Sequence, residues 1–355
     1  MALAKAMPIM PNAVERAAFL RLHLAPGPLL EILNALSFRV VLAGVKLGIF
    51  DALAKGPATA DAVAAAIGAD ARATRITLDA LEPLGYVKRD GRGLYRNTAM
   101  TSKWLVRDAG LSFAAGFEFW EEGFFTFWRD LETSIRAGKP AVDFYAWIAS
   151  KPDVSARFQA WMTAIAALGA SEVVAKVPIP AGAKSLIDVG GGHASYAIAF
   201  ARAHPSLNAT VVDAPHALAY AAKNVDEAGL ASRIALAPGD FWTTDLGRDH
   251  DVALLFNVVH GMEVADMRAL VRRTADALAP GGRLVVMEQL EGAVGGSAPK
   301  AATRLMSLNY LHMIGGVVHR YEDVARALGD AGLAKPRRTK LLRTPGTSLV
   351  IATKP

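Results

Sequence analysis

The chain of 355 residues contains no cysteine. That absence excludes a disulfide framework, a thiolate metal site and a cysteine nucleophile, so any catalysis must rest on other side chains. The sequence also lacks an uncharged apolar run long enough to cross a bilayer, and its N-terminus lacks the order of a secretory signal. We therefore expect a cytoplasmic protein without a membrane partner.

Blocks of like charge are missing as well. The formal net charge is +6, but Lys and Arg are spread along the chain apart from a short cluster at 335–340. This dispersion argues against a nucleic-acid partner. Hydrophobic residues make up 52% of the chain and charged residues 20%, which is enough apolar material for packed cores, and the length suits two domains.

The first third of the sequence predicts a helical domain that ends in a short β-ribbon. The expected elements are helices at 28–53, 57–68 and 70–84, followed by two strands around the turn at 90–93. Three helices and a ribbon are the order of a winged helix, which can bind DNA. The candidate recognition helix carries only Arg72 and Arg75 as basic residues, so it would neutralise few phosphates. We predict a winged-helix domain that packs against protein over 1–108, with a DNA-binding regulator as a remote alternative.

Aromatic residues are concentrated between positions 109 and 170, which we predict to be a helical linker and pocket segment. They cluster at 117–128, 143–148 and 158–162. Most are expected in a core because aromatic side chains mainly bury area, and the remainder are candidates for the wall of an apolar substrate pocket. The pocket candidates are Phe158, Trp161, Met162 and, further along the chain, Met313.

The last half of the chain predicts a Rossmann-like α/β domain over 171–355. From Lys184 onward, short apolar strands alternate with helical segments of about 10 to 15 residues, which is typical of a parallel sheet covered on both faces. A helix at 321–331 and a closing hairpin are expected at the C-terminal end.

Three successive strands of this half end in residues that suit a nucleotide-like ligand. The first ends at Gly190 and Gly192, where bare backbone lets a ligand approach the start of a helix. The next ends at Asp213, 23 residues after Gly190, where a carboxylate can accept hydrogen bonds from both ribose hydroxyls. The third ends at Asp240 and Phe241, an acid and an aromatic ring for adenine. The glycine corner alone suits NAD, FAD or S-adenosylmethionine, so an NAD-dependent dehydrogenase remains an alternative.

Two further strands place a histidine and a glutamate at the same edge. His260 is expected to end the strand DVALLFNVV, and Glu288 is expected to end the next strand. A neutral histidine can accept the proton of a hydroxyl near pH 7, and a buried carboxylate at Nδ1 would fix the tautomer that leaves Nε2 free. Of the other histidines, His312 and His319 are candidates to meet a substrate. No pair of histidines has the spacing and carboxylate partner of a metal site, so no metal is expected.

Taken together, these motifs resemble the S-adenosylmethionine-dependent small-molecule O-methyltransferases, a family that includes caffeic acid, isoflavone and acetylserotonin enzymes and many bacterial natural-product enzymes. The motifs are LIDVGGG at 186–192, VVD-x-P at 211–215, GDF at 239–241, NVVH at 257–260 and LAPGGRLVVMEQ at 278–289. The likeness spans about residues 35–352.

The resemblance implies a function and a set of roles. It implies S-adenosylmethionine as the cofactor, with its amino acid part, ribose and adenine held at the three strand ends. The implied cofactor contacts are Gly190, Gly192, Asp213, Asp240, Phe241 and Asn257. It also implies His260 as the base and Glu288 as its orienting carboxylate, for methyl transfer to a hydroxyl of a small aromatic or natural-product acceptor. The N-terminal domain of this family pairs with its twin, so a homodimer is expected.

Several residues depart from the family pattern. Gly261 and Met262 follow the histidine where the family commonly has Asp and Trp, and Val318 stands where a second glutamate usually flanks the histidine. Ala194 replaces the last glycine of the first motif, and Phe256 replaces a lysine found in many relatives. These changes leave C- or N-methylation, or a non-methylating S-adenosylmethionine-binding enzyme, as alternatives to O-methylation.

Overall fold

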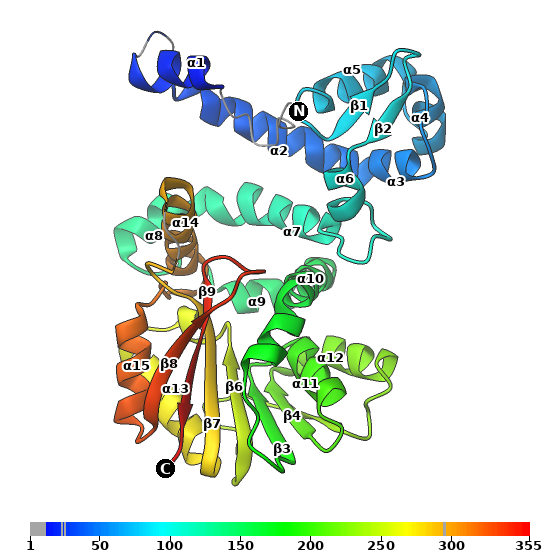
Figure 1. Cartoon of the computed structure of the whole chain (residues 1–355). Helices are drawn as coiled ribbons and strands as arrows, with labels where there is room; N and C mark the ends of the chain where they lie inside the picture. The colour runs from blue at the N-terminus through cyan, green and yellow to red at the C-terminus, as the bar shows by residue number, and fades with distance from the viewer. Residues whose placement is uncertain (1–11, 23, 25, 294–295) are drawn as a thin grey trace. The chain divides into compact units, whose positions relative to one another are not determined.

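The chain, seen as a computed structural model, folds into two compact units that divide between Glu121 and Glu122. The structure describes residues 12–22, 24, 26–293 and 296–355. Each unit has a hydrophobic core of its own. Helix α7, Ala114–Phe125, carries the chain from the first unit into the second (Figure 1).

The first unit is helical and contains one two-stranded ribbon. Its elements are α1 (Ala13–Arg16), the π-helical turn η1 (Ala17–Arg21), α2 (Leu29–Leu47), α3 (Ile49–Ala54), α4 (Ala60–Ile67), α5 (Ala71–Leu81), β1 (Val87–Arg89), β2 (Tyr95–Asn97) and α6 (Ala99–Trp104). The predicted order of helices and ribbon is present because the sequence supplies local signals: Thr59 and Asp70 accept backbone N–H groups at the starts of α4 and α5. The single helix predicted at 28–53 is wrong in one respect, since the chain turns at Gly48 (φ 78°) and divides into α2 and α3.

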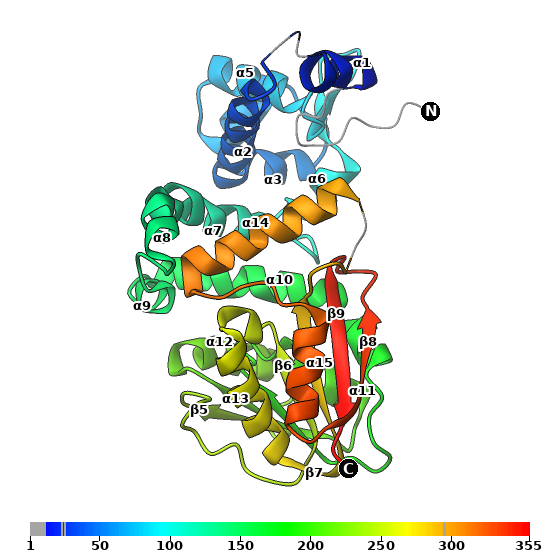
Figure 2. The ribbon, with the colours of Figure 1, turned by 90° about the vertical axis from the view of Figure 1, so that its left-hand side faces the viewer.

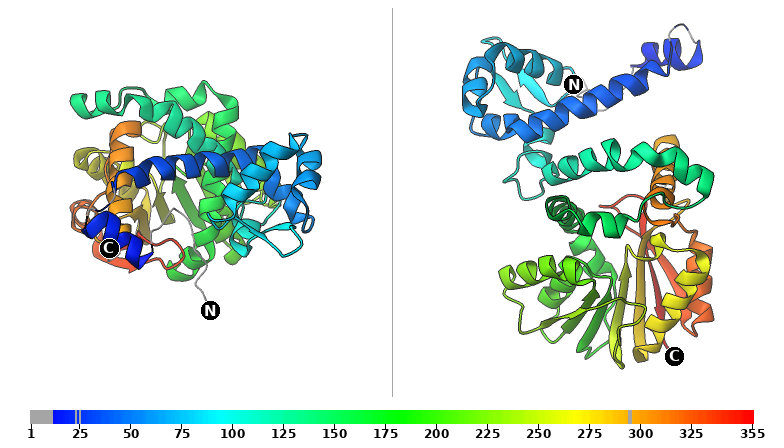
Figure 3. Two further views of the ribbon diagram at one scale, coloured as in Figure 1. Left: turned by 90° about the horizontal axis from the view of Figure 1, so that it is seen from above. Right: turned by 180° about the vertical axis from the view of Figure 1, so that it is seen from behind.

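The N-terminal half of α2 projects away from α3, α4 and α5 (Figure 3, right panel). Its C-terminal half is buried in the core of the unit through Val41 and Val45, whereas Leu29, Ile32 and Leu36 are exposed. Neighbouring exposed apolar side chains on a folded unit mark a surface that another protein can cover. The first unit therefore has an apolar surface available for self-association.

The second unit begins with helices and continues as an alternation of strands and helices. The helical part contains the 3-10 turn η2 (Phe127–Asp130), α8 (Leu131–Ala137), α9 (Phe144–Ala149) and α10 (Pro152–Lys176). The alternating part contains β3 (Ser185–Val189), α11 (Ser195–Ala203), β4 (Asn208–Asp213), α12 (Pro215–Glu227), β5 (Ile234–Pro238), β6 (His250–Phe256), η3 (Val259–Gly261), α13 (Val264–Asp276), β7 (Leu278–Gln289), α14 (Ser297–Ile314), α15 (Tyr321–Asp330), β8 (Ala334–Lys340) and β9 (Thr347–Thr353).

The strands form one sheet in the order β5-β4-β3-β6-β7-β9-β8. Strands β3 to β7 are parallel, whereas β9 is antiparallel to both β7 and β8. The predicted C-terminal hairpin is β8 and β9, and it places β9 beside β7, so the sheet is parallel from β5 to β7 and antiparallel at this edge. The strand order changes direction between β3 and β6, and open α/β sheets bind ligands in the crevice at the C-terminal side of such a point.

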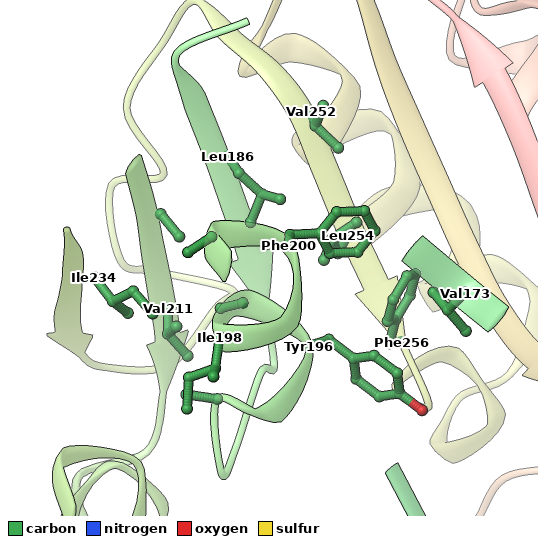
Figure 4. Packing of buried hydrophobic residues seen from close by; sticks show 14 of the residues in the cluster. Val173, Leu186, Tyr196, Ile198, Phe200, Val211, Ile234, Val252, Leu254 and Phe256 are labelled. Atoms are coloured by element: carbon green, nitrogen blue, oxygen red, sulfur yellow. The ribbon is translucent and has the colours of Figure 1, made fainter. Parts of the chain in front are cut away.

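Helices cover both faces of this sheet (Figure 2). On one face, α10, α11 and α12 pack against buried strand residues, among which Phe256 meets the ring of Tyr196 on α11 (Figure 4). On the other face, α13 and α15 pack against side chains such as Ile187 and Leu255. Both faces of each central strand are apolar, which is why the strands read as continuous hydrophobic runs. The predicted Rossmann-like α/β fold of this half is confirmed.

One described helix, α10, has the length and apolar composition of a membrane-spanning segment. Its Ala166 and Val173 are buried in the sheet core, and Ala170 and Val174 pack against the same cluster. The C-terminal part of this helix thus packs in the core of the α/β unit.

Candidate active site

The loop after β3 presents backbone that is free of side chains at the switch point. Gly190 and Gly192 have φ angles of 74° and 48°, which favour glycine. A Cβ on Gly190 would lie 2.6 Å from Cγ2 of Val258, so this loop lies directly against the loop after β6. Ala194, where the family has a further glycine, keeps the left-handed conformation with φ 60°. The departure at this position therefore leaves the shape of the corner intact.

The carboxylate of Asp213, at the end of β4, lies beside the glycine loop that follows β3. Its Oδ2 accepts the backbone N–H of Gly192 at 2.7 Å, and its Oδ1 accepts that of Ala214 at 2.7 Å. Burial raises the pKa of Asp213, although these two hydrogen bonds act in the opposite direction. The predicted ribose-binding acid thus stands beside the glycine backbone, as neighbouring parallel strands require.

Asp188, inside β3, is a buried acid to which the sequence analysis assigned no role. Its side chain is 1% exposed, and burial, followed by the negative charge of Asp213, raises its pKa to about 7. The signal for it was present in the sequence, because an acid within the apolar strand SLIDV is an anomaly.

The predicted adenine contacts lie in the loop after β5. Asp240 is exposed and its Oδ1 accepts the backbone N–H of Trp242 at 2.8 Å. Phe241 is half-buried against the second core cluster, and Arg273 donates to its carbonyl oxygen at 3.0 Å. Asn257 follows β6 with φ 55° and is exposed. All three residues lie at the C-terminal ends of their strands, on the same side of the sheet as the glycine corner.

His260 does not end a strand, which corrects the sequence expectation. Strand β6 ends at Phe256, and the left-handed conformation of Asn257 turns the chain into η3, which contains His260. The ring still reaches Glu288 on β7: Nδ1 of His260 lies 2.8 Å from Oε2 of Glu288. The structure therefore brings the two predicted residues together by way of a turn.

Glu288 also binds the backbone of the turn that contains His260. Its side chain is 1% exposed, and its Oε1 accepts the backbone N–H groups of Val258 at 2.8 Å and Val259 at 2.9 Å. Backbone donors at the start of a helical turn favour a negative charge. One carboxylate thus holds the turn that carries His260 and also holds the imidazole ring.

Two tyrosines complete the surroundings of His260, and neither was named as a site residue. The ring of Tyr310, on α14, stacks on that of His260 with centroids 4.1 Å apart and an angle of 21° between the planes. Tyr145, on α9, is 56% exposed, yet desolvation of its hydroxyl and the charges of Asp213 and Glu288 raise its pKa to about 12. The stack of Tyr310 on His260 joins elements far apart in sequence, so helical periodicity gives no signal for it.

The two other histidines proposed to meet a substrate, His312 and His319, are bonded within the protein. Both ring nitrogens of His312 have partners, with Nδ1 2.8 Å from Ser134 Oγ and Nε2 2.9 Å from the Phe127 carbonyl oxygen. Nε2 of His319 lies 2.9 Å from the carbonyl oxygen of Val259. The interpretation that His312 or His319 meets a substrate is replaced by a structural role for each. Within the described ranges, no group of three metal-ligating side chains is present.

The predicted pocket residues come from two helices. Phe158, Trp161 and Met162 are half-buried on α10, and Phe158 meets the ring of Phe144 edge to face at 5.6 Å. Met313, on α14, is 6% exposed and so is nearly all within the packing. The three α10 side chains keep more accessible surface than Met313 does.

Two family models match the chain. That of an O-methyltransferase domain matches residues 128–334, and that of an O-methyltransferase dimerisation domain matches residues 30–107. The first covers the whole set of site residues described above, and the second covers α2 to α6.

Individual relatives agree with these models. The 3-hydroxy-5-methyl-1-naphthoate 3-O-methyltransferase of Streptomyces sahachiroi is 30% identical over 318 residues, 88% of this chain and 90% of that protein. The phenazine-1-carboxylate N-methyltransferase of Pseudomonas aeruginosa is 27% identical and covers 84% of this chain and 89% of its own length. The structure of human N-acetylserotonin methyltransferase in complex with S-adenosylmethionine has the same fold, with a TM-score of 0.81 at 23% identity, over 98% of this chain and 99% of that one.

Proposed function

The chain belongs to the S-adenosylmethionine-dependent O-methyltransferase family, and from that premise we propose that it methylates a hydroxyl group of a small aromatic acceptor with His260 as the general base. The observation that carries this proposal is the 2.8 Å contact between Nδ1 of His260 and Glu288. It lies at the switch point of the sheet, beside the loop that contains Gly190.

The residues at the strand ends fit the cofactor. Gly192 offers bare backbone, and the adjacent carboxylate of Asp213 suits two ribose hydroxyls. Asp240 and Phe241, after β5, are proposed for adenine, and Asn257, after β6, is proposed as a further cofactor contact at the same edge of the sheet. S-adenosylmethionine would supply a methyl group bonded to a sulfonium sulfur. An acceptor oxygen aligned with that bond can attack the methyl carbon, with the sulfur as the leaving group.

His260 provides the proton acceptor for that displacement. Because Glu288 accepts the hydrogen bond of Nδ1–H, Nε2 carries a lone pair and is free to take the acceptor's hydroxyl proton. The acceptor oxygen then bonds to the methyl carbon as the carbon–sulfur bond breaks and its electron pair stays on sulfur. Glu288 stabilises the imidazolium formed in this step.

The proposed acceptor is planar and largely apolar. Phe158, Trp161, Met162 and Met313 supply aromatic and thioether surface of the kind that lines pockets for such molecules. The name of the Streptomyces sahachiroi relative, which acts on a hydroxynaphthoate, supports a hydroxylated aromatic ring.

A second candidate function is methyl transfer to nitrogen. Val318, which is 7% exposed, stands where the family usually has a second glutamate beside the histidine, so the site has lost an acid that would assist proton removal. The Pseudomonas relative is named as an N-methyltransferase. An acceptor nitrogen with a free lone pair would need no base.

We also propose that the enzyme is a cytoplasmic homodimer. The match to a dimerisation domain at 30–107 and the exposed Leu29, Ile32 and Leu36 on α2 support pairing of two copies. Light scattering of the purified chain would test this, and a monomer at micromolar concentration would contradict it.

The decisive experiment compares His260→Ala with the parent. Both proteins are incubated with isotope-labelled S-adenosylmethionine and a panel of hydroxylated and aminated aromatics, and the methylated atom is assigned by NMR. We expect O-methyl products and a fall in kcat of about 10²- to 10⁴-fold in the variant, with cofactor binding by calorimetry retained. His204→Ala is the matched control. His204 is the C-cap of α11, at the edge of the sheet opposite to the candidate active site. Undiminished turnover in His260→Ala refutes the base role, and products methylated on nitrogen alone favour the second candidate.

A further inference from the structure

We propose that Tyr310 is the positioning residue that fixes the plane of the His260 imidazole, in the place of the second carboxylate that this chain lacks. The inference rests on the proposed function, because it concerns the same histidine. It assigns a role to a residue outside the motifs that identify the family.

Two contacts hold the ring of His260. Glu288 bonds to Nδ1, and this single hydrogen bond limits the rotation of the ring about its Cβ–Cγ bond without fixing the plane of the ring. The ring of Tyr310 lies parallel to it at 4.1 Å and 21°, which covers one face and opposes that rotation. The His260 side chain is 13% exposed, and Nδ1 and one face are occupied, so we assign Nε2 to the acceptor.

Tyr310 is itself held in place by contacts on its own helix. The preceding residue, Asn309, accepts a hydrogen bond from Trp128 Nε1 at 3.0 Å. Two residues later, His312 bonds to Ser134 and to the Phe127 carbonyl oxygen. Residues before and after Tyr310 thus attach α14 to η2 and α8. We infer that these contacts keep the ring of Tyr310 in place beside His260.

The loop after α14 connects this support to the turn that carries the histidine. The backbone N–H of Val317 donates to the carbonyl oxygen of His260 at 2.8 Å, and His319 bonds to the carbonyl oxygen of Val259 at 2.9 Å. The same loop contains Val318, whose buried side chain has no group that could bond to the imidazole. The second contact to the ring therefore comes from the face of Tyr310 and not from an acid.

The chemistry of the phenol agrees with this role. Burial and the neighbouring charge of Glu288 raise the pKa of Tyr310, so its ring is neutral at working pH. The face of a neutral phenol is electron-rich and attracts a cation, so it favours the imidazolium that forms when His260 takes a proton.

The test compares Tyr310→Phe, which keeps the ring, with Tyr310→Leu, which removes it. We expect Tyr310→Phe to keep the parental kcat within about twofold and Tyr310→Leu to lose about 2- to 13-fold in kcat, with the Kd for S-adenosylhomocysteine unchanged. NMR of histidine-labelled protein should show His260 ring resonances that broaden in Tyr310→Leu alone, because an imidazole that is no longer held exchanges between orientations. A change in chemical shift without broadening is expected from loss of the tyrosine ring current and does not count as support. Tyr321→Leu, which removes a half-buried tyrosine bonded to the Pro336 carbonyl oxygen, controls for general loss of packing.

Two results overturn the proposal. One is parental kcat together with His260 resonances that are no broader than in the parent. This is measured in Tyr310→Leu, or in Tyr310→Met if the leucine variant does not fold. The other is an equal loss of kcat in Tyr310→Phe, which would assign the effect to the hydroxyl. The NMR measurement needs no turnover, so it separates a failure of this inference from a failure of the proposed function, which His260→Ala tests.

Discussion

Gly316 lies directly against the backbone of His260 and Gly261: a Cβ built on Gly316 would come within 2.6 Å of the Cα of Gly261 and closer still to the His260 carbonyl oxygen. Real Cβ atoms are not found at such distances, and the obstructing atoms are backbone, which has little room to move. The loop after α14 and the turn that carries the histidine are thus packed with no space between them.

Gly316→Ala should therefore displace His260. We expect a fall in kcat of about 10²-fold, because a shift of about 1 Å in a catalytic group has that effect, and a loss of about 1 to 3 kcal/mol in the free energy of unfolding. Steady-state kinetics and urea denaturation measure the two quantities. Gly329→Ala is the matched control, since a Cβ there meets nothing within 4 Å and the residue is in α15. Equal kinetics for the two variants would contradict the prediction.

Glu288→Gln should separate the two tasks of this side chain. The amide oxygen of glutamine can still accept the N–H groups of Val258 and Val259, but its NH₂ would face Nδ1 of His260. That contact favours the tautomer with the proton on Nε2, which leaves no base, so kcat should fall by about 10²- to 10⁴-fold while the fold is retained. The exposed Glu263→Gln serves as the control. A parental kcat in Glu288→Gln would exclude the orienting role.

Asp213→Asn should weaken cofactor binding. Both oxygens of Asp213 already accept backbone N–H groups, and a ribose would add bonds to the same charged group. Loss of the charge costs about 1.5 to 3 kcal/mol, equivalent to about a 10- to 150-fold higher Kd for S-adenosylhomocysteine in calorimetry. Asp226→Asn, an exposed acid on α12, is expected to keep the parental Kd. An unchanged Kd in Asp213→Asn would remove this residue from the cofactor site.

Glu172 gives the protein a predictable dependence of stability on pH. Burial alone would raise its pKa, but bonds from Lys176 and from the backbone of Leu342 and Arg343 outweigh burial and lower the pKa to about 2 from the usual 4.5. A carboxyl group whose pKa is lower in the folded state stabilises the fold above its unfolded pKa, and this contribution is lost as the pH falls.

Glu172→Gln should therefore be less stable than the parent by about 1.5 to 3 kcal/mol at pH 7, and the difference should shrink as the pH falls from 4.5 toward 2. Urea denaturation as a function of pH measures it. Glu227→Gln, which loses an exposed contact to Lys223, should stay within about 0.5 kcal/mol of the parent at every pH. A difference that is constant with pH would show that the charge of Glu172 is not responsible.

The sequence was a good guide wherever the signal is local. Asp70 caps the helix that it was expected to start, the helix predicted from 57 begins two to three residues later with Thr59 as its cap, and the alternation after Lys184 predicted the strands of the sheet. The acids and glycines of the cofactor motifs lie at the strand ends, because side chains at the same end of parallel strands share one edge.

Prediction from the sequence failed where the position of a residue depends on a contact with a distant segment. The insertion of β9 between β7 and β8 depends on which edge of the sheet is open, and the position of His260 in a turn depends on the Glu288 carboxylate that binds the turn's N–H groups. The residues next to β9 and next to His260 in the sequence give no sign of either contact.

By itself, the sequence determined the α/β class, the order of the strands along the chain and the placement of the proposed cofactor residues at the strand ends, because periodicity and turn residues act over a few positions. Only the tertiary structure decided that Tyr310 covers the ring of His260 and that His312 is bound to Ser134. These contacts join positions 50 and 178 residues apart, and they form only when the helices pack, since their energy comes from burial and from the exclusion of water.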